Sequence, residues 1–132
     1  MVMQKVVMDA DIIIDFTRKA SPLLRILFEK AAQKEIRLFI SSSVVAELMS
    51  GRETKAEVKF KELSLLIKKI EFVPMNYDLS VSAGFLVRDI NNLKLADAIV
   101  AATAVSLNAK LATRNKKDFQ DIKGLKFFKL CD

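Results

Sequence analysis

Short apolar runs alternate along the chain with longer segments in which apolar positions recur every three or four residues. The short runs predict β-strands at residues 5–8, 37–40, 71–73, 110–113 and 125–130. The periodic segments predict helices that begin near Ser21 and at residues 44–50, 55–69, 78–91 and 95–107. Because short strands alternate with helices, we expect an α/β fold with a central, mostly parallel sheet of four to five strands.

Polar residues mark where several of these helices begin. Ser21 and Pro22 suit a helix cap followed by the first helical position. The run Ser41–Ser43 suits the cap of helix 44–50, in which Ser43 and Glu47 resemble a loosened capping box, and Gly51 ends that helix. Helix 95–107 is apolar on nearly every side, which predicts a buried central helix.

Acidic residues concentrate at one edge of the predicted sheet. In a parallel sheet with crossover helices, strand C-termini and helix N-termini share one edge, and ligands bind there. The acidic and amide residues that fall on this edge are Asp9, Asp11, Glu47, Asp97, Asn115 and Asp118. Converging carboxylates stay ionised when a cation lies among them, and oxygen ligands suit Mg²⁺ or Mn²⁺.

Each acid also has a simpler interpretation when it is taken alone. Asp9 suits a turn or cap, and Asp11 and Asp15 suit the start of a helix. Glu47 and Asp118 suit a solvated surface. Asp97 differs from these, because it is the only charge between Leu95 and Asn108 on a helix that should be buried. The shared location of the acids therefore carries the hypothesis of a metal site.

Composition narrows the chemistry further. The 132 residues suit one domain, residues 1–132. There is no histidine, which excludes Ser-His-Asp and Cys-His catalysis and histidine-ligated zinc. The single cysteine, Cys131, excludes a disulfide framework and a cysteine-based metal site. Hydrolytic chemistry at this edge would then depend on carboxylates and a metal-activated water.

The net charge of +6 is unevenly distributed. Residues 110–129 hold seven Lys and Arg against two Asp, and residues 50–70 hold six against three acids. Arg114, Lys116 and Lys117 lie beside Asn115, and a basic rim around an acidic pocket suits a polyanionic substrate such as RNA. The lysines of residues 55–69 also suit a solvated helix face. With one Tyr and no Trp, the chain offers no obvious platform for stacking bases.

The sequence gives no sign of export or membrane insertion. Residues 1–8 carry no signal-peptide pattern, and the longest uncharged apolar stretch, residues 98–109, is shorter than the roughly 20 residues that span a bilayer. We therefore expect a cytoplasmic protein that does not associate with membranes.

Four segments together resemble the motifs of PIN-domain nucleases. These are an apolar strand with Asp9 and Asp11, the segment 40–48 that delivers Glu47, the segment 95–104 around Asp97, and the segment 111–119 around Asn115, with residues 122–125 fitting the end of the last motif. Each motif is weak alone, but four in order and at the expected spacing are specific. The size and layout resemble the toxin component of VapBC toxin–antitoxin systems.

This resemblance implies a three-layer α/β/α fold and a Mg²⁺- or Mn²⁺-dependent endoribonuclease. Asp9, Glu47 and Asp97 match the three acids that hold the metal. The fourth acidic position falls on Asn115, which removes one charge, and Asp118 three residues later is the alternative. Residues that suit the orientation of these ligands are Thr113, Ser43 and Asp11.

The resemblance also implies partners. Toxins of this kind form homodimers and are inhibited by a small VapB-like antitoxin that enters the active-site groove. Helix 55–69 and the apolar side of residues 44–49 are candidate interfaces, although burial in the core of one chain would explain both equally well.

Two other functions remain open at this point. Asp9-Ala10-Asp11 after a strand also resembles the start of a haloacid-dehalogenase-type phosphatase, in which the first Asp is a nucleophile, but that class does not explain Glu47 or Asp97. The Asn at position 115 keeps open a PIN-like module that binds RNA or protein without cutting.

Overall fold

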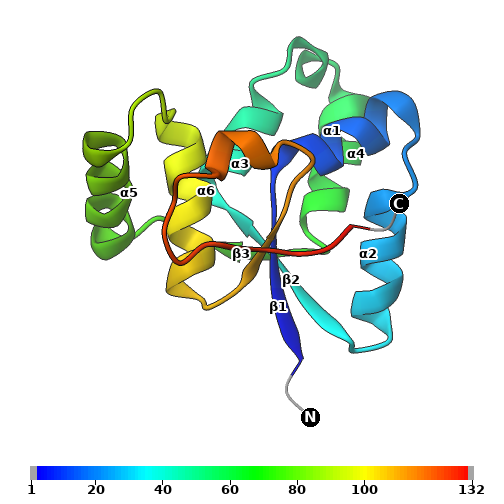
Figure 1. The fold of residues 1–132 in the computed structure, drawn as a ribbon. Coiled ribbons are helices and arrows are strands. Elements are labelled where there is room, and N and C mark those ends of the chain that lie inside the picture. The colour runs from blue at the N-terminus through cyan, green and yellow to red at the C-terminus, as the bar shows by residue number, and fades with distance from the viewer. Residues whose placement is uncertain (1–2, 131–132) are drawn as a thin grey trace.

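A sheet of five parallel strands organises the structure, a computed structural model that describes residues 3–130 (Figure 1). The strands are β1 (Gln4–Met8), β2 (Ile36–Ser41), β3 (Glu71–Val73), β4 (Lys110–Ala112) and β5 (Lys126–Phe127). Their order is β3-β2-β1-β4-β5, and each neighbouring pair is parallel. The prediction of a mostly parallel sheet is confirmed. Met1, Val2, Cys131 and Asp132 lie outside the described residues.

The register of the sheet brings distant parts of the chain level with one another. Met8 at the end of β1 pairs with Ile40 of β2 and with Ala112 of β4. One residue later, the Asp9 amide donates a hydrogen bond to the Ala112 carbonyl at 3.0 Å. The residues that follow β1, β2 and β4 therefore meet at one edge of the sheet.

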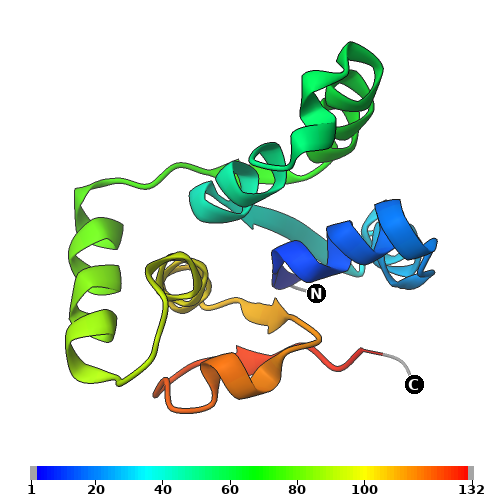
Figure 2. The ribbon, with the colours of Figure 1, turned by 90° about the horizontal axis from the view of Figure 1, so that it is seen from above.

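Helices cover both faces of this sheet and give the expected three-layer α/β/α fold (Figure 2). The helices are α1 (Ala10–Lys19), α2 (Leu23–Ala32), α3 (Ser42–Met49), α4 (Glu57–Ile67), α5 (Tyr77–Asp89) and α6 (Leu95–Ser106), with 3-10 turns η1 (Arg52–Lys55) and η2 (Lys116–Phe119). α6 packs on β1, β2 and β4 with α5 outside it, whereas α2 packs on β2 from the other face. None of the helices among residues 3–130 is long and apolar enough to cross a membrane.

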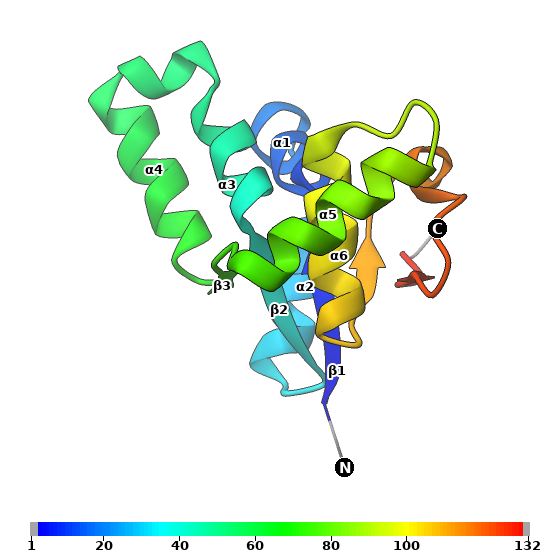
Figure 3. The same cartoon turned by 90° about the vertical axis from the view of Figure 1, so that its left-hand side faces the viewer.

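The core lies between the central strands and α6. Val6, Val7 and Met8 of β1 are fully buried, as are Ala101 and Ala104 of α6, which confirms that this helix is a central one. By contrast, α4 contains no buried residue, and it projects with η1 from the rest of the fold (Figure 3). Val58 and Leu65 on α4 are 66% and 65% exposed, so apolar surface is left uncovered there.

One helix, α1, was not among the predicted elements. Its signals are present in hindsight: Asp9 caps it by accepting a hydrogen bond from the Ala10 amide at 2.8 Å, and Asp11 lies in its first turn. Arg18 and Lys19 lie in its last turn, where positive charge suits the helix dipole. Three consecutive isoleucines between these signals obscured the helical pattern.

Other predicted boundaries need correction. α2 begins at Leu23 with Pro22 at its cap and no capping side chain, so Ser21 is not the cap. For α3 the capping residue is Ser41, which accepts from the Val44 amide, and Ser43 lies inside the helix. The helix predicted over residues 55–69 is shorter, since α4 spans Glu57–Ile67. The chain before it forms the separate turn η1, where the Thr54 hydroxyl donates to the Met49 and Gly51 carbonyls.

Candidate active site

Asp9 lies at the centre of the edge where the strands end. It is 9% exposed, and its position is fixed by two hydrogen bonds. Its Oδ1 accepts from the Ala10 amide at 2.8 Å, and its Oδ2 accepts from the Thr113 hydroxyl at 2.8 Å. The carboxylate that was predicted as a ligand is therefore held between the start of α1 and the end of β4.

Thr113 joins the two sides of this site. It is 1% exposed, and while its hydroxyl donates to Asp9 the same oxygen accepts from the Asn115 amide at 3.0 Å. The residue lies directly after β4, whose pairing with β1 brings it opposite Asp9. Thr113 thus orients Asp9, as its sequence position had indicated.

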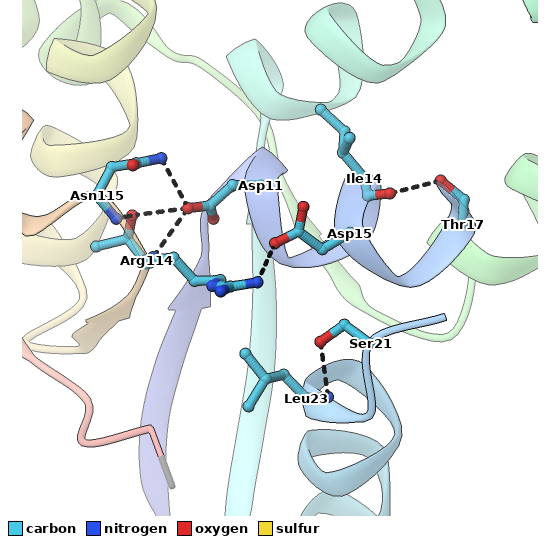
Figure 4. A network of polar contacts seen from close by, with 9 residues as sticks. Asp11, Ile14, Asp15, Thr17, Ser21, Leu23, Arg114 and Asn115 are labelled. Atoms are coloured by element: carbon cyan, nitrogen blue, oxygen red, sulfur yellow. Dashed lines mark hydrogen bonds and ion pairs between the residues drawn. The ribbon is translucent and has the colours of Figure 1, made fainter. Parts of the chain in front are cut away.

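Asp11 fastens the loop that follows β4 (Figure 4). Its Oδ2 accepts from the Arg114 amide at 2.8 Å and from the Asn115 side-chain amide at 3.0 Å, and it lies 3.4 Å from the Thr113 hydroxyl. Its Oδ1 is buried without a hydrogen-bond partner among residues 3–130. Asp11 therefore fixes the conformation of residues 113–115, and one of its oxygens still lacks a donor or a cation.

Glu47 and Asp97 reach the same edge from α3 and α6. The two helix starts are tied together because the Ser43 hydroxyl donates to the Ala96 carbonyl at 2.9 Å, one residue before Asp97. Ser43 also lies 3.3 Å from the Ser41 hydroxyl that caps α3. Ser43 therefore positions the backbone beside Asp97, and its hydroxyl contacts no carboxylate within the part of the chain that the structure describes.

The carboxylates at this edge interact electrostatically. Burial, followed by repulsion from Asp9, Asp118 and Glu47, raises the pKa of Asp97 to about 6, against a smaller opposing effect of Lys94. Burial and repulsion from Asp9 likewise raise the pKa of Asp11 to about 6, although amide donors oppose the shift. Both groups are thus harder to ionise than an ordinary aspartate.

The other two acids show the same direction. The pKa of Asp9 is raised by burial and, to a smaller extent, by Asp118, while its hydrogen bonds from Thr113 and Ala10 lower it. The pKa of Glu47 is raised by desolvation of its carboxyl group and by Asp9. We call Asp9, Glu47, Asp97 and Asp118 the acid cluster, because each of them repels at least one of the others.

The donor chemistry of the acid cluster fits a hard divalent cation. Its side chains offer carboxylate oxygens as metal ligands, and Mg²⁺ and Mn²⁺ prefer such ligands. A bound cation would also relieve the repulsion among the carboxylates. Over residues 3–130, however, no three Asp, Glu or Cys side chains are already gathered in an arrangement that could hold one ion.

Asn115 and Asp118 have different surroundings. The Asn115 side chain donates to Asp11 rather than facing the acid cluster as an acid would. Asp118, on η2, acts electrostatically on both Asp9 and Asp97. Asp118 therefore acts on two carboxylates of the acid cluster, whereas the Asn115 side chain is bonded to Asp11.

The basic residues predicted to bind substrate fall into two groups. The Arg114 guanidinium forms an ion pair with Asp15, and its side chain remains about half exposed. Lys116 and Lys117 are exposed, and Lys116 Nζ lies 5.7 Å from the centre of the Phe127 ring. Asp15 itself lies one helical turn after Asp11 on α1, a spacing that could have placed it on the same face.

An open hollow of about 850 Å³ lies beside η2. We call it the basic hollow, since the charged residues that line it are Arg114, Lys116, Lys117, Lys129 and Asp118. Ser21 and the start of α2 form its other wall. The sequence had placed Lys129 in a basic segment without linking it to the site.

A comparison with protein-family models matches the PIN domain over residues 6–125. Among solved structures, the chain is similar to one in the structure of VapBC-1 from nontypeable Haemophilus influenzae, with 26% identity and a TM-score of 0.73 over 95% of this chain and 97% of that chain. It is also similar to a chain of VapBC from Salmonella typhimurium bound to DNA, with 22% identity and a TM-score of 0.80 over 96% of this chain and 98% of that chain. A chain of VapBC2 from Rickettsia felis, bound to a promoter DNA fragment, matches with 24% identity and a TM-score of 0.78 over 95% of this chain and 98% of that chain. At those two identities the likeness concerns the fold. No match was found among curated proteins.

Proposed function

The chain belongs to the PIN-domain family, and from this premise we propose that it is a Mg²⁺- or Mn²⁺-dependent endoribonuclease, the toxin of a VapBC-like toxin–antitoxin pair. The observation that carries the proposal is the acid cluster at the C-terminal edge of the sheet, with the basic hollow directly beside it. Such a pair of surfaces suits metal-assisted cleavage of a polyanion.

The residues divide the work as follows. Asp9, Glu47 and Asp97 would hold the cation, with Asp118 as the fourth carboxylate. When bound, the cation neutralises charge on the phosphate and lowers the pKa of a coordinated water. Thr113 holds Asp9 in its orientation, and Asp11 holds the loop that carries Thr113. Lys94 partly offsets the negative charge of Glu47 and Asp97.

An aspartyl-phosphate mechanism is less well supported. It would use Asp9 alone as the nucleophile, whereas the structure places Asp9 among other carboxylates that repel it or one another. That alternative also leaves Asp97 and Glu47 without a role.

The proposal is tested by incubating the purified protein with single-stranded and structured RNA in Mg²⁺, in Mn²⁺ or in EDTA. We expect internal cleavage with either metal and none in EDTA. Gel separation of the products measures the cleavage. Cleavage that survives EDTA contradicts the metal requirement. Binding of RNA without cleavage under all three conditions would instead identify a non-cutting PIN-like module.

Position 115 provides a sharper prediction. Asn115→Asp restores the acid that the family motif carries, but we expect it to weaken the site. Asp11 Oδ2 now accepts a hydrogen bond from the Asn115 side-chain amide at 3.0 Å, and in the variant it would face a second carboxylate. The expected loss is about 1 kcal/mol of unfolding free energy at pH 7.5, together with slower cleavage. Thermal melting and the cleavage rate measure the two effects.

The matched control for this variant is Gln33→Glu, the same amide-to-carboxylate change at the exposed end of α2. It should leave cleavage unchanged. If Asn115→Asp instead cleaves faster and binds Mn²⁺ more tightly than the native chain, residue 115 is a metal ligand. Its role as a hydrogen-bond partner of Asp11 would then be the wrong interpretation.

We also propose a homodimer and a small VapB-like antitoxin as partners. The solved relatives named above are VapBC complexes. The chain leaves apolar side chains uncovered on two helices: Val58 and Leu65 on α4, and Phe85, 52% exposed, on α5. One apolar side of α4, with Leu63 and Leu66, packs against the core, whereas Val58 and Leu65 stay exposed, so the exposed side is the part of helix 55–69 that we propose as an interface. Light scattering at micromolar concentration distinguishes a dimer from a monomer.

A further inference from the structure

We propose that the basic hollow binds the phosphate backbone of the RNA strand next to the cleavage position, without reading its bases. This inference rests on the proposed function, because it assigns the path of that function's substrate. It extends the rim residues predicted from sequence by adding Lys129 and by giving the strand a direction away from the acid cluster.

The position of the hollow is the first support. It opens directly off the acid cluster, because Thr113 and Asp118 line it, and Thr113 donates to Asp9 while Asp118 repels Asp97. A strand whose reacting phosphate lies at the acid cluster can therefore continue into the hollow. With about 850 Å³, the hollow is of the size that takes a nucleotide rather than a lone ion.

The charge of the hollow is the second support. Lys116, Lys117 and Lys129 are exposed, and none of them forms an ion pair with an acidic side chain within residues 3–130. The Arg114 guanidinium is occupied by Asp15 at the edge shown in Figure 4. The three lysines therefore provide the positive charge that a phosphate would contact, and among residues 3–130 Asp118 is the acid in the lining.

The lining also indicates what the hollow recognises. It contains no aromatic side chain on which a base could stack. Lysine ammonium groups bind phosphates as point charges, and phosphate contacts position a strand without reading its sequence. Contacts from the hollow should therefore contribute equally to the binding of RNAs of any sequence.

An acidic segment of a protein would satisfy the same lysines. RNA is the better occupant because the hollow adjoins the acid cluster, where the proposed chemistry needs a phosphodiester. The acidic peptide is treated below as an outcome of the test.

The experiment compares two double variants with the same change in net charge. Lys117→Ala with Lys129→Ala removes two lysines from the hollow. Lys123→Ala with Lys126→Ala removes two exposed lysines from the same part of the chain that face other surfaces. Both are made in an Asp97→Asn background, so that cleavage does not consume the probe. The probes are labelled single-stranded 12-mers of oligo(U) and of mixed sequence, and anisotropy gives the dissociation constant between 50 and 300 mM KCl.

For the hollow variant we expect affinity at about 0.15 M salt to fall roughly tenfold, and equally for both RNAs. The slope of log K against log salt should become shallower by about 1.4, since each phosphate contact to a single strand contributes about 0.7. The control pair should change affinity by less than about twofold and leave the slope as it was.

Several results would overturn the inference. Equal losses in both double variants would indicate a general effect of charge, and a loss confined to one RNA sequence would indicate base recognition. Tighter binding of a poly-glutamate peptide than of RNA, abolished only in the hollow variant, would assign the surface to an acidic protein. If the native chain cleaves RNA in Mg²⁺ but the hollow variant binds RNA normally, the inference fails while the proposed function stands.

Discussion

Asp97→Asn is expected to lower the rate of RNA cleavage by more than about 100-fold while raising the thermal stability of the metal-free protein. The loss of activity follows because Asp97 is a proposed ligand, and even the groups that only orient ligands typically contribute 10- to 100-fold. The gain in stability follows first from the burial of the Asp97 carboxylate and then from its repulsion by Asp9, Asp118 and Glu47. The two effects thus have opposite signs in one variant.

The stability gain should depend on pH in a definite direction. The pKa of Asp97 is about 6 in the folded protein, against an ordinary value of 3.8. Because the folded pKa is the higher one, the carboxyl group favours folding most when it is protonated, and that contribution is lost as the pH rises through 6. In EDTA, the melting temperature of Asp97→Asn should therefore exceed that of the native chain at pH 7.5, and the gap should close near pH 4.

Asp89→Asn is the matched control on α5. The pKa of Asp89 is lowered by its hydrogen bonds from Arg88, so its substitution should leave cleavage unchanged and should not raise the melting temperature. If Asp97→Asn retains cleavage, Asp97 is not a ligand. If it melts below the native chain at pH 7.5 in EDTA, the repulsion within the acid cluster has been overstated.

Thr113→Val should slow cleavage roughly 10- to 100-fold and destabilise the fold by about 1–3 kcal/mol. Valine matches threonine in shape but lacks the hydroxyl. Asp9 Oδ2 therefore loses its donor at 2.8 Å, and the backbone amide of Asn115 loses its acceptor at 3.0 Å. The Thr113 side chain is 1% exposed, so water is a poor substitute for its hydroxyl. Chemical denaturation and single-turnover cleavage measure the two losses.

Two further variants separate the hydroxyl from general packing. Thr113→Ser keeps the hydroxyl and should recover most of the cleavage rate. Thr103→Val removes an equally buried hydroxyl, which donates to the Ile99 carbonyl within α6, and should affect stability much more than cleavage. Equal cleavage by Thr113→Val and the native chain would show that Thr113 does not position Asp9.

The location of the site could be predicted because it depends on topology. Asp9 follows β1 and Asp97 lies in the first turn of α6, and in a parallel sheet those positions meet at one edge whatever the details of packing. Glu47 lies further along, on the short helix α3 that begins directly after β2. The repulsion now seen among them is a direct result of that convergence.

Contacts between distant residues could not be predicted in the same way. Nothing in the sequence near Arg114 indicates that Asp15, 99 residues earlier, would occupy its guanidinium. Likewise the strand predicted over residues 125–130 is paired with β4 only over Lys126–Phe127, and one further hydrogen bond runs from the Phe128 amide to the Leu111 carbonyl. The local pattern of apolar residues predicts that a segment is a strand, whereas the neighbouring strand determines how many of its residues pair.

The pairing of β1 with β4 has a consequence for the order in which the chain is made. Val6 pairs with Lys110, so the centre of the sheet stays open while about a hundred residues are synthesised between them. Until β4 docks, Asp9 lacks its donor from Thr113, and Asp11 lacks the loop that it fastens. A nascent chain interrupted before residue 110 would carry Asp9, Glu47 and Asp97 but could not orient the first of them. The topology therefore delays assembly of the site until late in translation, and a non-local parallel pairing of this kind also forms slowly.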